Sequence, residues 1–221
     1  MSTNTNGSQK RKPKNPIKFK LQLTEEQKLG KAIILDNKIT VVTGKAGSSK
    51  TFLCCNVALD LLFTKQIEKI VIMRPMVGTE DIGHLPGDIN DKMQPWMTPI
   101  IENMYDLYDK TKIEKEIVEG RIRILPLQFT QGVTFRNSAV IVDEAQNCTK
   151  EQLKMILTRT GIDSKIMIAG DPQQIQIRRK SDSGLSKLID VAERIDKLAL
   201  IHLTSNYRDP IVEQIIDEYD N

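Results

Sequence analysis

The stretch "GKAGSSKT", Gly44 to Thr51, decides how the rest of the chain is interpreted. It matches the phosphate-binding loop G-x-x-x-x-G-K-[ST] except that Ser49 stands where the motif has its second glycine. Such a loop needs a strand before it and a helix after it. Both are expected here, because "ITVVT" (39–43) is a short apolar run and "KTFLCCNVALDLLF" (50–63) is apolar nearly all round. The sequence therefore predicts a nucleotide site.

The roles of the loop residues follow from the geometry of the motif. Backbone N–H groups converge on the phosphates, and the N-terminus of the next helix adds about half a positive charge. Lys50 would reach the β- and γ-phosphates, and Thr51 would place its hydroxyl on Mg²⁺. Glycine is usual at position 49 because the backbone comes close to phosphate or takes a conformation that Cβ disfavours. Serine is the mildest departure, since it is small and its hydroxyl can donate to phosphate. The predicted binding residues are Gly44, Lys45, Ala46, Gly47, Ser48, Ser49, Lys50 and Thr51.

Short runs rich in Ile and Val recur along the chain and alternate with helical patterns. Most of these runs are apolar without alternation, as is typical of strands covered on both faces of a parallel sheet. "RIRIL" (121–125) alternates and is expected near an edge, and "CTKEQLKMILTRTG" (148–161) predicts a helix with a capping box at Thr149 and Gln152 and a stop at Gly161. This alternation predicts an α/β domain with a mostly parallel central sheet. The expected strands are 39–43, 69–73, 121–125, 139–142, 165–169 and 198–203.

One stretch breaks this rhythm. Residues 74–99 are rich in Pro, Gly and Met and are too long for a plain connection. They predict a functional loop.

Composition places the chain among ordinary soluble proteins. With 221 residues, 39% hydrophobic and 28% charged, it has room for one sizeable domain and an appendage. No apolar run approaches the roughly 18 residues of a membrane span, and no secretory segment opens the chain, so no membrane partner is expected. Three cysteines without a C-x-x-C pair or Cys/His cluster disfavour structural zinc. They favour reduced thiols in a cytoplasm, which would be the host's if the source is viral.

The net charge of +3 conceals an asymmetry. Residues 1–20 hold six basic side chains and no acidic one, whereas residues 21–221 carry 26 basic and 29 acidic groups. With little to bury, residues 1–20 are expected to form a mobile basic tail before a domain at 21–221. Three interpretations of the tail stay open: a solvated segment that aids solubility, a tether to nucleic-acid phosphates, or a localisation signal.

Two acids follow the apolar strand in "AVIVDEAQN". Ligands gather at the carboxyl ends of such strands. Asp143 would hold Mg²⁺ through water, and Glu144 would orient the attacking water as a general base. The alternative is two surface acids after a strand.

Two further polar side chains follow apolar strands. Gln174 in "MIAGDPQQI" would touch the γ-phosphate or the attacking water, unless it is simply a polar turn residue. Arg208 in "HLTSNYRDP" would stabilise transition-state charge on the γ-phosphate, unless it forms a surface salt bridge on the final helix.

The order of these motifs resembles the PhoH-like (phosphate starvation-inducible) ATPases, which are related to superfamily 1 helicase cores. The resemblance covers residues 21–221, and its most specific part is "RP" with "GHLPGD" followed by "DEAQN". It implies a RecA-like three-layer α/β/α P-loop NTPase domain that hydrolyses ATP with Mg²⁺. The chain departs from the family pattern at Ser49 and around Arg178 and Arg179. The supporting stretches are "GKAGSSKT", "IVIMRPMV", "GHLPGD", "IVDEAQN", "GDPQQI" and "SNYRDPIVEQII".

The resemblance also implies roles outside the loop. Gln27 lies 17 residues before Gly44, where helicase-like relatives keep a glutamine that recognises adenine, but "TEEQ" also makes it the N3 residue of a capping box. Arg74 and Trp96 occupy the part that touches single-stranded RNA or DNA in related helicases. Trp96 can instead be a core or interface aromatic.

The resemblance further implies a homo-oligomer, with a hexameric ring favoured. In such helicases nucleotide binds in a cleft between two RecA-like units, and this chain carries one set of motifs. A neighbouring copy would therefore complete the site. Arg208, Arg178 and Arg179 are the candidates for an arginine that reaches the phosphates, in its own chain or a neighbour's.

The predicted function is therefore a Mg²⁺-dependent ATPase, coupled as an oligomer to binding or unwinding of RNA or single-stranded nucleic acid. The alternative is a nucleotide-binding scaffold with little turnover. A GTPase is disfavoured because no Asn-Lys-x-Asp follows the loop, and a small-molecule kinase because no arginine-rich lid is evident.

Overall fold

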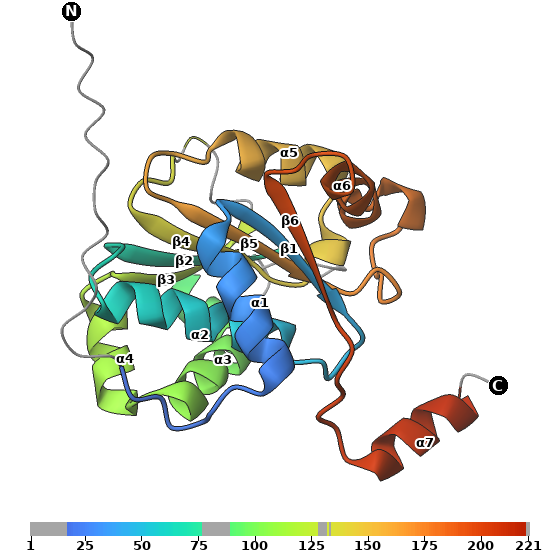
Figure 1. Cartoon of the computed structure of the whole chain (residues 1–221), viewed down its shortest axis with the longest axis horizontal. Coiled ribbons are helices and arrows are strands. Elements are labelled where there is room, and N and C mark those ends of the chain that lie inside the picture. The colour runs from blue at the N-terminus through green and yellow to red at the C-terminus, as the bar shows by residue number, and fades with distance from the viewer. Residues whose placement is uncertain (1–16, 77–88, 128–131, 133, 220–221) are drawn as a thin grey trace, which may run out of the picture.

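The computed structural model describes residues 17–76, 89–127, 132 and 134–219. Its centre is a six-stranded sheet of order β3-β2-β4-β5-β1-β6 (Figure 1). Every strand pair in this part of the chain is parallel, which confirms the predicted α/β fold. The sequence predicted a mostly parallel sheet, and the described sheet is parallel throughout. The strands are β1 (Ile39–Gly44), β2 (Lys69–Arg74), β3 (Ile122–Pro126), β4 (Ser138–Val142), β5 (Lys165–Gly170) and β6 (Leu198–Leu203).

Helices cover both faces of the sheet, which gives the predicted three layers (Figure 1). On one face lie α1 (Glu25–Asp36), α2 (Lys50–Phe63), α3 (Ile89–Leu107) and α4 (Lys110–Val118). On the other lie α5 (Lys150–Thr158) and α6 (Gly184–Ala192). The last helix, α7 (Pro210–Tyr219), extends away from the sheet. Short 3-10 turns occur at Ala145–Asn147 and Lys180–Asp182.

The strands have apolar sequences because both faces of the sheet are buried. All five residues of β4 are buried. Ala139 and Ile141 pack into the core on the α2 side, while Val140 and Val142 pack into the core on the α5 and α6 side. The alternating strand β3 lies at the edge of the sheet, as its pattern predicts.

The helix after the phosphate loop begins at Lys50, where the sequence places it. Nine of the 14 residues of α2 are buried, and it packs against both α1 and α3. These contacts explain why the sequence of α2 is apolar on nearly all faces of the helix. Cys54 and Cys55 belong to this buried set, and both are free thiols.

The prediction of a loop over residues 74–99 is wrong in its last part, because α3 begins at Ile89. The helix contains Pro95 and Pro99, each of which removes one backbone donor. The packing of Ile100 and Met104 into the core offsets that loss. Residues 77–88 lie outside the described residues.

Two helices begin with capping boxes, at Thr24 with Gln27 and at Thr149 with Gln152. The second was predicted as a helix start and is confirmed. The helix α5 ends at Thr158, before the predicted stop at Gly161.

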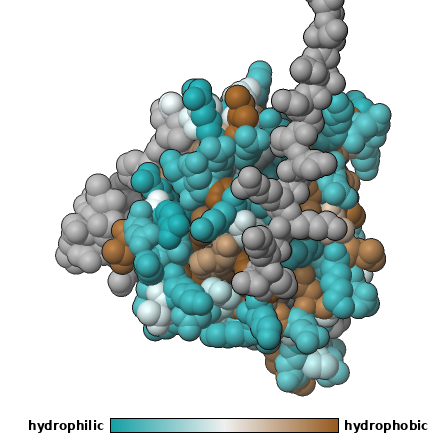
Figure 2. Space-filling model, turned by 60° about the vertical axis from the view of Figure 1, so that its left-hand side comes forward, coloured by the Kyte–Doolittle hydropathy of each residue, from teal (hydrophilic) through white to brown (hydrophobic). Residues whose placement is uncertain are grey.

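The side of the molecule brought forward in Figure 2 is mainly hydrophilic, with hydrophobic residues scattered among the polar ones. Within the described ranges, no helix combines the length and apolar character needed to cross a membrane.

Candidate nucleotide-binding site

The residues that follow β1, β4 and β5 surround one cavity of about 380 Å³. Parallel strands place their carboxyl ends at the same edge of the sheet, so motifs far apart in the sequence meet there. The cavity lining includes Ala46, Gly47, Ser49, Lys50, Thr51, Asp143, Glu144, Asp171, Gln174 and Arg208. The structure thus brings together the predicted residues of four separate motifs.

The ammonium of Lys50 lies at the start of α2 and bridges the beginning of the loop. Its Nζ donates to the carbonyl oxygens of Gly44 and Lys45 at 2.8 and 2.9 Å. Burial lowers the pKa of Lys50, while the negative charges of Asp171, Glu144 and Asp143 oppose that shift. A cation held at a helix N-terminus beside the loop amides is placed to bind phosphate oxygens.

Thr51 and Asp143 form the closest polar contact between the loop and the second motif. The Thr51 hydroxyl donates to Asp143 Oδ1 at 2.6 Å. Asp143 is only 6% exposed, and this burial raises its pKa although the hydrogen bond from Thr51 opposes the shift. A hydroxyl and a carboxylate side by side are oxygen ligands of the kind that Mg²⁺ prefers. The residues present therefore fit the ion that the loop motif implies.

Both carboxylate oxygens of Glu144 contact a neighbouring side chain. Gln146 Nε2 donates to Oε2 at 2.6 Å, and the Arg74 guanidinium lies 3.4 Å from Oε1. The backbone of Glu144 is left-handed, with φ of 53°, which turns the chain sharply after β4. These contacts fix the carboxylate at the cavity wall. Arg74, predicted to contact nucleic acid, lies against the candidate base, and its nucleic-acid role stays a prediction.

The comparison with known proteins starts with a family model. The model described as PhoH-like protein matches residues 20–220. The chain belongs to the PhoH-like protein family. It is 38% identical over 186 residues to the PhoH-like protein of Mycobacterium tuberculosis (strain ATCC 25618 / H37Rv), an alignment that covers 83% of this chain and 53% of that relative. With the PhoH-like protein of Bacillus subtilis (strain 168), identity is 37% over 187 residues, covering 83% and 59%. This PhoH-like chain spans little more than half the length of these relatives.

A solved structure agrees with the fold. The large terminase of a thermophilic bacteriophage superposes with a TM-score of 0.58 at 11% identity, covering 89% of this chain and 50% of the terminase. Another crystal form of that terminase, in complex with ADP, gives a TM-score of 0.53 at 12% identity. The P-loop NTPase fold predicted from the sequence is confirmed.

The structure of the PhoH-like chain explains why the loop motif has glycine where Ser49 stands. Ser49 has φ of 64° and ψ of 29°, which is the left-handed region. Glycine enters this region at no steric cost, whereas a residue with Cβ is strained there. Its side chain makes no capping hydrogen bond to α2 in return.

Replacing Ser49 with glycine is therefore expected to stabilise the protein. Removing the steric cost of Cβ in the left-handed region stabilises the folded state by about 1 kcal/mol. Glycine also raises the conformational entropy of the unfolded chain, which offsets part of that gain. We expect the free energy of unfolding to rise by roughly 0.5 kcal/mol in chemical denaturation. The matched control is Ser48→Gly, because Ser48 does not have positive φ and glycine there should destabilise. A lower stability for Ser49→Gly would contradict this explanation.

Asp171 is a cavity residue that the sequence reasoning missed. It is 5% exposed and accepts the Gln173 N–H at 3.0 Å. Its own N–H donates to the Gln146 side-chain oxygen at 3.0 Å, so Gln146 joins it to Glu144. The signal was present, because Asp171 directly follows an apolar strand as Asp143 does. Gln174, which was predicted, lines the same cavity.

The segment between β6 and α7 brings Arg208 to the cavity of its own chain. Tyr207 N donates to the Gly47 carbonyl at 3.1 Å, so the segment is attached to the phosphate loop. Arg178 and Arg179 are exposed and do not line this cavity. Either of them could still reach a neighbouring copy, which stays a prediction.

Two predicted residues lie elsewhere. Gln27 is buried, and its side-chain oxygen accepts the Thr24 N–H at 3.0 Å in the capping box. The local interpretation is therefore confirmed; Gln27 does not line the cavity, and its adenine role stays a prediction. Trp96 belongs to α3, but its side chain lies outside the described part of the structure.

Proposed function

We propose that this PhoH-like chain binds ATP with Mg²⁺ in the cavity and hydrolyses it. The observation that carries this proposal is the 2.6 Å hydrogen bond between Thr51 and Asp143. It joins the phosphate loop to the acid motif across 92 residues of sequence. Either motif alone also occurs without function, but their meeting at a helix N-terminus is the arrangement that phosphoryl transfer requires.

The residues of the chain divide the work of hydrolysis. The loop amides and Lys50 would bind the β- and γ-phosphates, and Thr51 with Asp143 would hold Mg²⁺. When bound, the ion neutralises phosphate charge and orients the reacting group. Glu144 would orient the attacking water and accept its proton. Gln174, which lines the cavity, would contact that water or the γ-phosphate.

Arg208 completes the set as the cation for the γ-phosphate. Its side chain lines the cavity, and within the described residues no carboxylate forms an ion pair with its guanidinium. Charge that develops on phosphate oxygens in the transition state is stabilised by such an arginine.

We also propose coupling of hydrolysis to single-stranded nucleic acid. Arg74 supports this role, because its guanidinium contacts the Glu144 carboxylate. A nucleic-acid phosphate that drew Arg74 away would remove that contact and change the surroundings of the candidate base. The six basic side chains of residues 1–20 would add affinity that falls steeply with salt.

Assembly into a homo-oligomer, with a hexameric ring favoured, is part of the proposal. The helix α7 supports it, because Ile211, Val212, Ile215 and Tyr219 are exposed large hydrophobic residues on a helix that extends from the body. A second copy covering this helix would lie next to Arg208.

A nucleotide-binding scaffold with little turnover is the second candidate. The strained backbone of Ser49 favours it, as do the contacts that occupy both oxygens of Glu144. In that case the chain would bind nucleotide and leave it intact.

Phosphate release from ATP separates these candidates. We expect phosphate release that requires Mg²⁺ and rises when single-stranded RNA or DNA is added. Light scattering on the same ATP-bound sample measures the mass of the assembly. Nucleotide binding without release under any of these conditions would favour the scaffold. A monomer that turns over rapidly would exclude the ring.

A further inference from the structure

The carboxylate of Glu26, in the first turn of α1, accepts three hydrogen bonds from the segment that leads to Arg208. Its Oε1 accepts from the Thr204 N–H at 2.7 Å and from the Thr204 hydroxyl at 2.8 Å. Its Oε2 accepts from the Ser205 N–H at 3.2 Å. One side chain thus binds two consecutive residues that lie 178 and 179 positions further along the chain.

These hydrogen bonds favour the ionised carboxylate. Burial alone would raise the pKa of Glu26, but the bonds from Thr204 and Ser205 outweigh it and lower the pKa to about 2. Because the folded-state pKa is below the ordinary value of 4.5, the resulting stabilisation is present above pH 4.5 and is lost as the pH falls through about 2. At neutral pH the contact is therefore fully formed.

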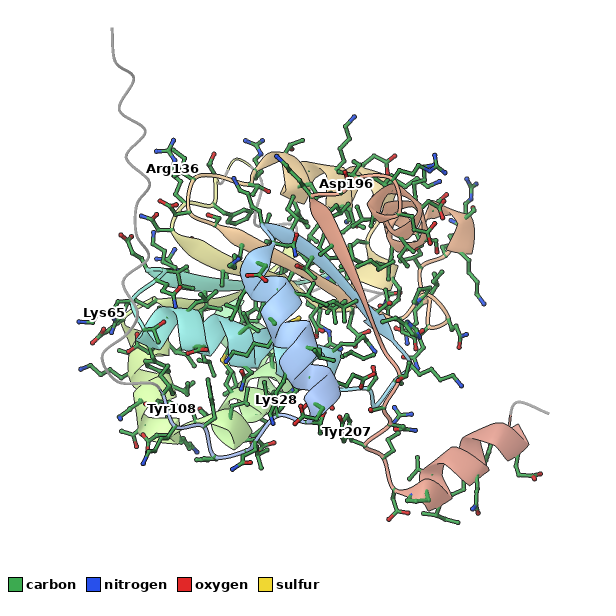
Figure 3. All side chains as sticks on the ribbon, in the orientation of Figure 1. Lys28, Lys65, Tyr108, Arg136, Asp196 and Tyr207 are labelled. Atoms are coloured by element: carbon green, nitrogen blue, oxygen red, sulfur yellow. The ribbon has the colours of Figure 1, made fainter. Side chains whose placement is uncertain are left out.

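A second contact joins the same two parts of the chain. The hydroxyls of Thr24 and Tyr207 are 2.9 Å apart. Figure 3 places Tyr207 below the N-terminal end of α1, where β6 has ended. We call the contacts of Glu26 and Thr24 with Thr204, Ser205 and Tyr207 the α1 clasp.

The segment held by the α1 clasp, residues 204–207, also contacts the phosphate loop. Tyr207 N donates to the Gly47 carbonyl at 3.1 Å, and Arg208 N donates to Asn206 Oδ1 at 3.0 Å. The fit is tight: a Cβ at Gly47, where φ is 86°, would lie 2.7 Å from Asn206 Oδ1 and 2.8 Å from Arg208 Cγ. Arg208 therefore enters the cavity from a backbone that α1 fixes on one side and the loop fixes on the other.

Nothing in the cavity lining would reveal this role, because Glu26 is not part of it. Its neighbour Glu25 differs sharply. Glu25 is 86% exposed, and among the described residues its one ion pair is with Lys28, at 2.7 Å, on the same helix. Two adjacent acids of the same helix turn thus provide a test position and a control.

We propose that Glu26 is a positioning residue that holds Arg208 at the γ-phosphate side of the cavity. The inference rests on the proposed function, because Arg208 must act on nucleotide for its position to affect turnover. Loss of Glu26 would remove three of the four hydrogen bonds of the α1 clasp while leaving Lys50, Thr51 and Asp143 in place. The consequence would concern the γ-phosphate, which distinguishes ATP from ADP.

The test compares Glu26→Ala, Glu25→Ala, Arg208→Ala and the double variant Glu26→Ala/Arg208→Ala. Misplacement of a catalytic group by about 1 Å costs on the order of 100-fold, so we expect Glu26→Ala to lower kcat by roughly 10- to 100-fold. Affinity for ADP should change by less than about 3-fold, and Glu25→Ala should behave as wild type. The double variant should match Arg208→Ala, because one residue acts through the other. Glu26→Gln, which keeps one acceptor oxygen, should recover part of the rate.

Two outcomes would overturn the proposal. One is a double variant whose losses multiply, because Glu26 would then act independently of Arg208. The other is equal weakening of ATP and ADP binding in Glu26→Ala, which would indicate a general structural defect.

A measurement without nucleotide separates this proposal from the proposed function. Hydrogen exchange of the Thr204 and Ser205 amides should accelerate in Glu26→Ala and not in Glu25→Ala. Unchanged exchange would refute the clasp even in an active enzyme. Accelerated exchange in a protein without ATPase activity would leave the clasp intact and reject hydrolysis. In that case a selective loss of affinity for a non-hydrolysable ATP analogue over ADP would still show that Glu26 positions Arg208, and an equal loss for both would refute it.

Discussion

Replacing Lys50 with alanine is expected to lower kcat/KM for ATP by about 1000-fold, the scale for losing a preorganised charged donor at a transition state. The side chain supplies a positive charge beside the loop amides, and no other lysine lines the cavity in the described part of the chain. Its charge would act on both bound and transferring phosphates, so we expect KM to rise and kcat to fall. Phosphate release over a range of ATP concentrations measures both constants.

The matched control is Lys187→Ala, because Lys187 is an exposed lysine on α6 and lies outside the cavity lining. That variant should stay within about 3-fold of wild type, as expected for a surface charge. Lys50 also donates to two loop carbonyls, so thermal unfolding of both variants must show that the fold survives. A folded Lys50→Ala variant with wild-type kinetics would exclude the cavity as the ATP site.

The sheet could be predicted from sequence because its strands are buried on both faces. Runs such as Ile70–Met73 and Ala139–Val142 contain no polar residue, and that pattern persists only where helices cover a parallel sheet on each side. The alternation in "RIRIL" also had a physical cause, since Arg123 points outward at the edge of the sheet. Local pattern and final environment agree at these positions.

The beginning of α3 could not be predicted, because local signals there oppose the structure. Pro95 and Pro99 are expected to end helices, yet the buried residues that follow them hold α3 in the core. Burial of Ile100, Met104 and Leu107 stabilises by more than the two lost hydrogen bonds cost.

The candidate site was predicted where each residue belongs to a motif with its own local context. Lys50, Thr51 and Asp143 follow or begin regular elements, so their meeting at one sheet edge follows from topology. Glu26 carries no such signal: "TEEQ" predicts a capping box, and its contact with Thr204 joins segments 178 residues apart. Only the folded chain reveals that contact.

Glu144→Gln is expected to abolish most hydrolysis while preserving ATP binding. An amide cannot accept a proton from water, and loss of a general base typically costs about 100- to 10,000-fold. The substitution keeps the size of the side chain and the left-handed turn of the backbone, so the loop and the Thr51–Asp143 pair should stay in place. We expect kcat to fall by roughly 1000-fold with ATP affinity within about 3-fold of wild type.

The control for this variant is Glu151→Gln, on α5 and outside the cavity lining, which should retain full activity. Together with Lys50→Ala, the measurement separates the two candidate functions. If Lys50→Ala loses ATP binding while Glu144→Gln binds ATP but does not cleave it, the cavity is a hydrolytic site. If wild type and Glu144→Gln bind ATP equally and neither releases phosphate, Glu144 has no proton to accept. The contacts of Glu144 with Gln146 and Arg74 would then stabilise the conformation of the nucleotide-binding cavity. A scaffold that binds nucleotide without cleaving it needs only that stability.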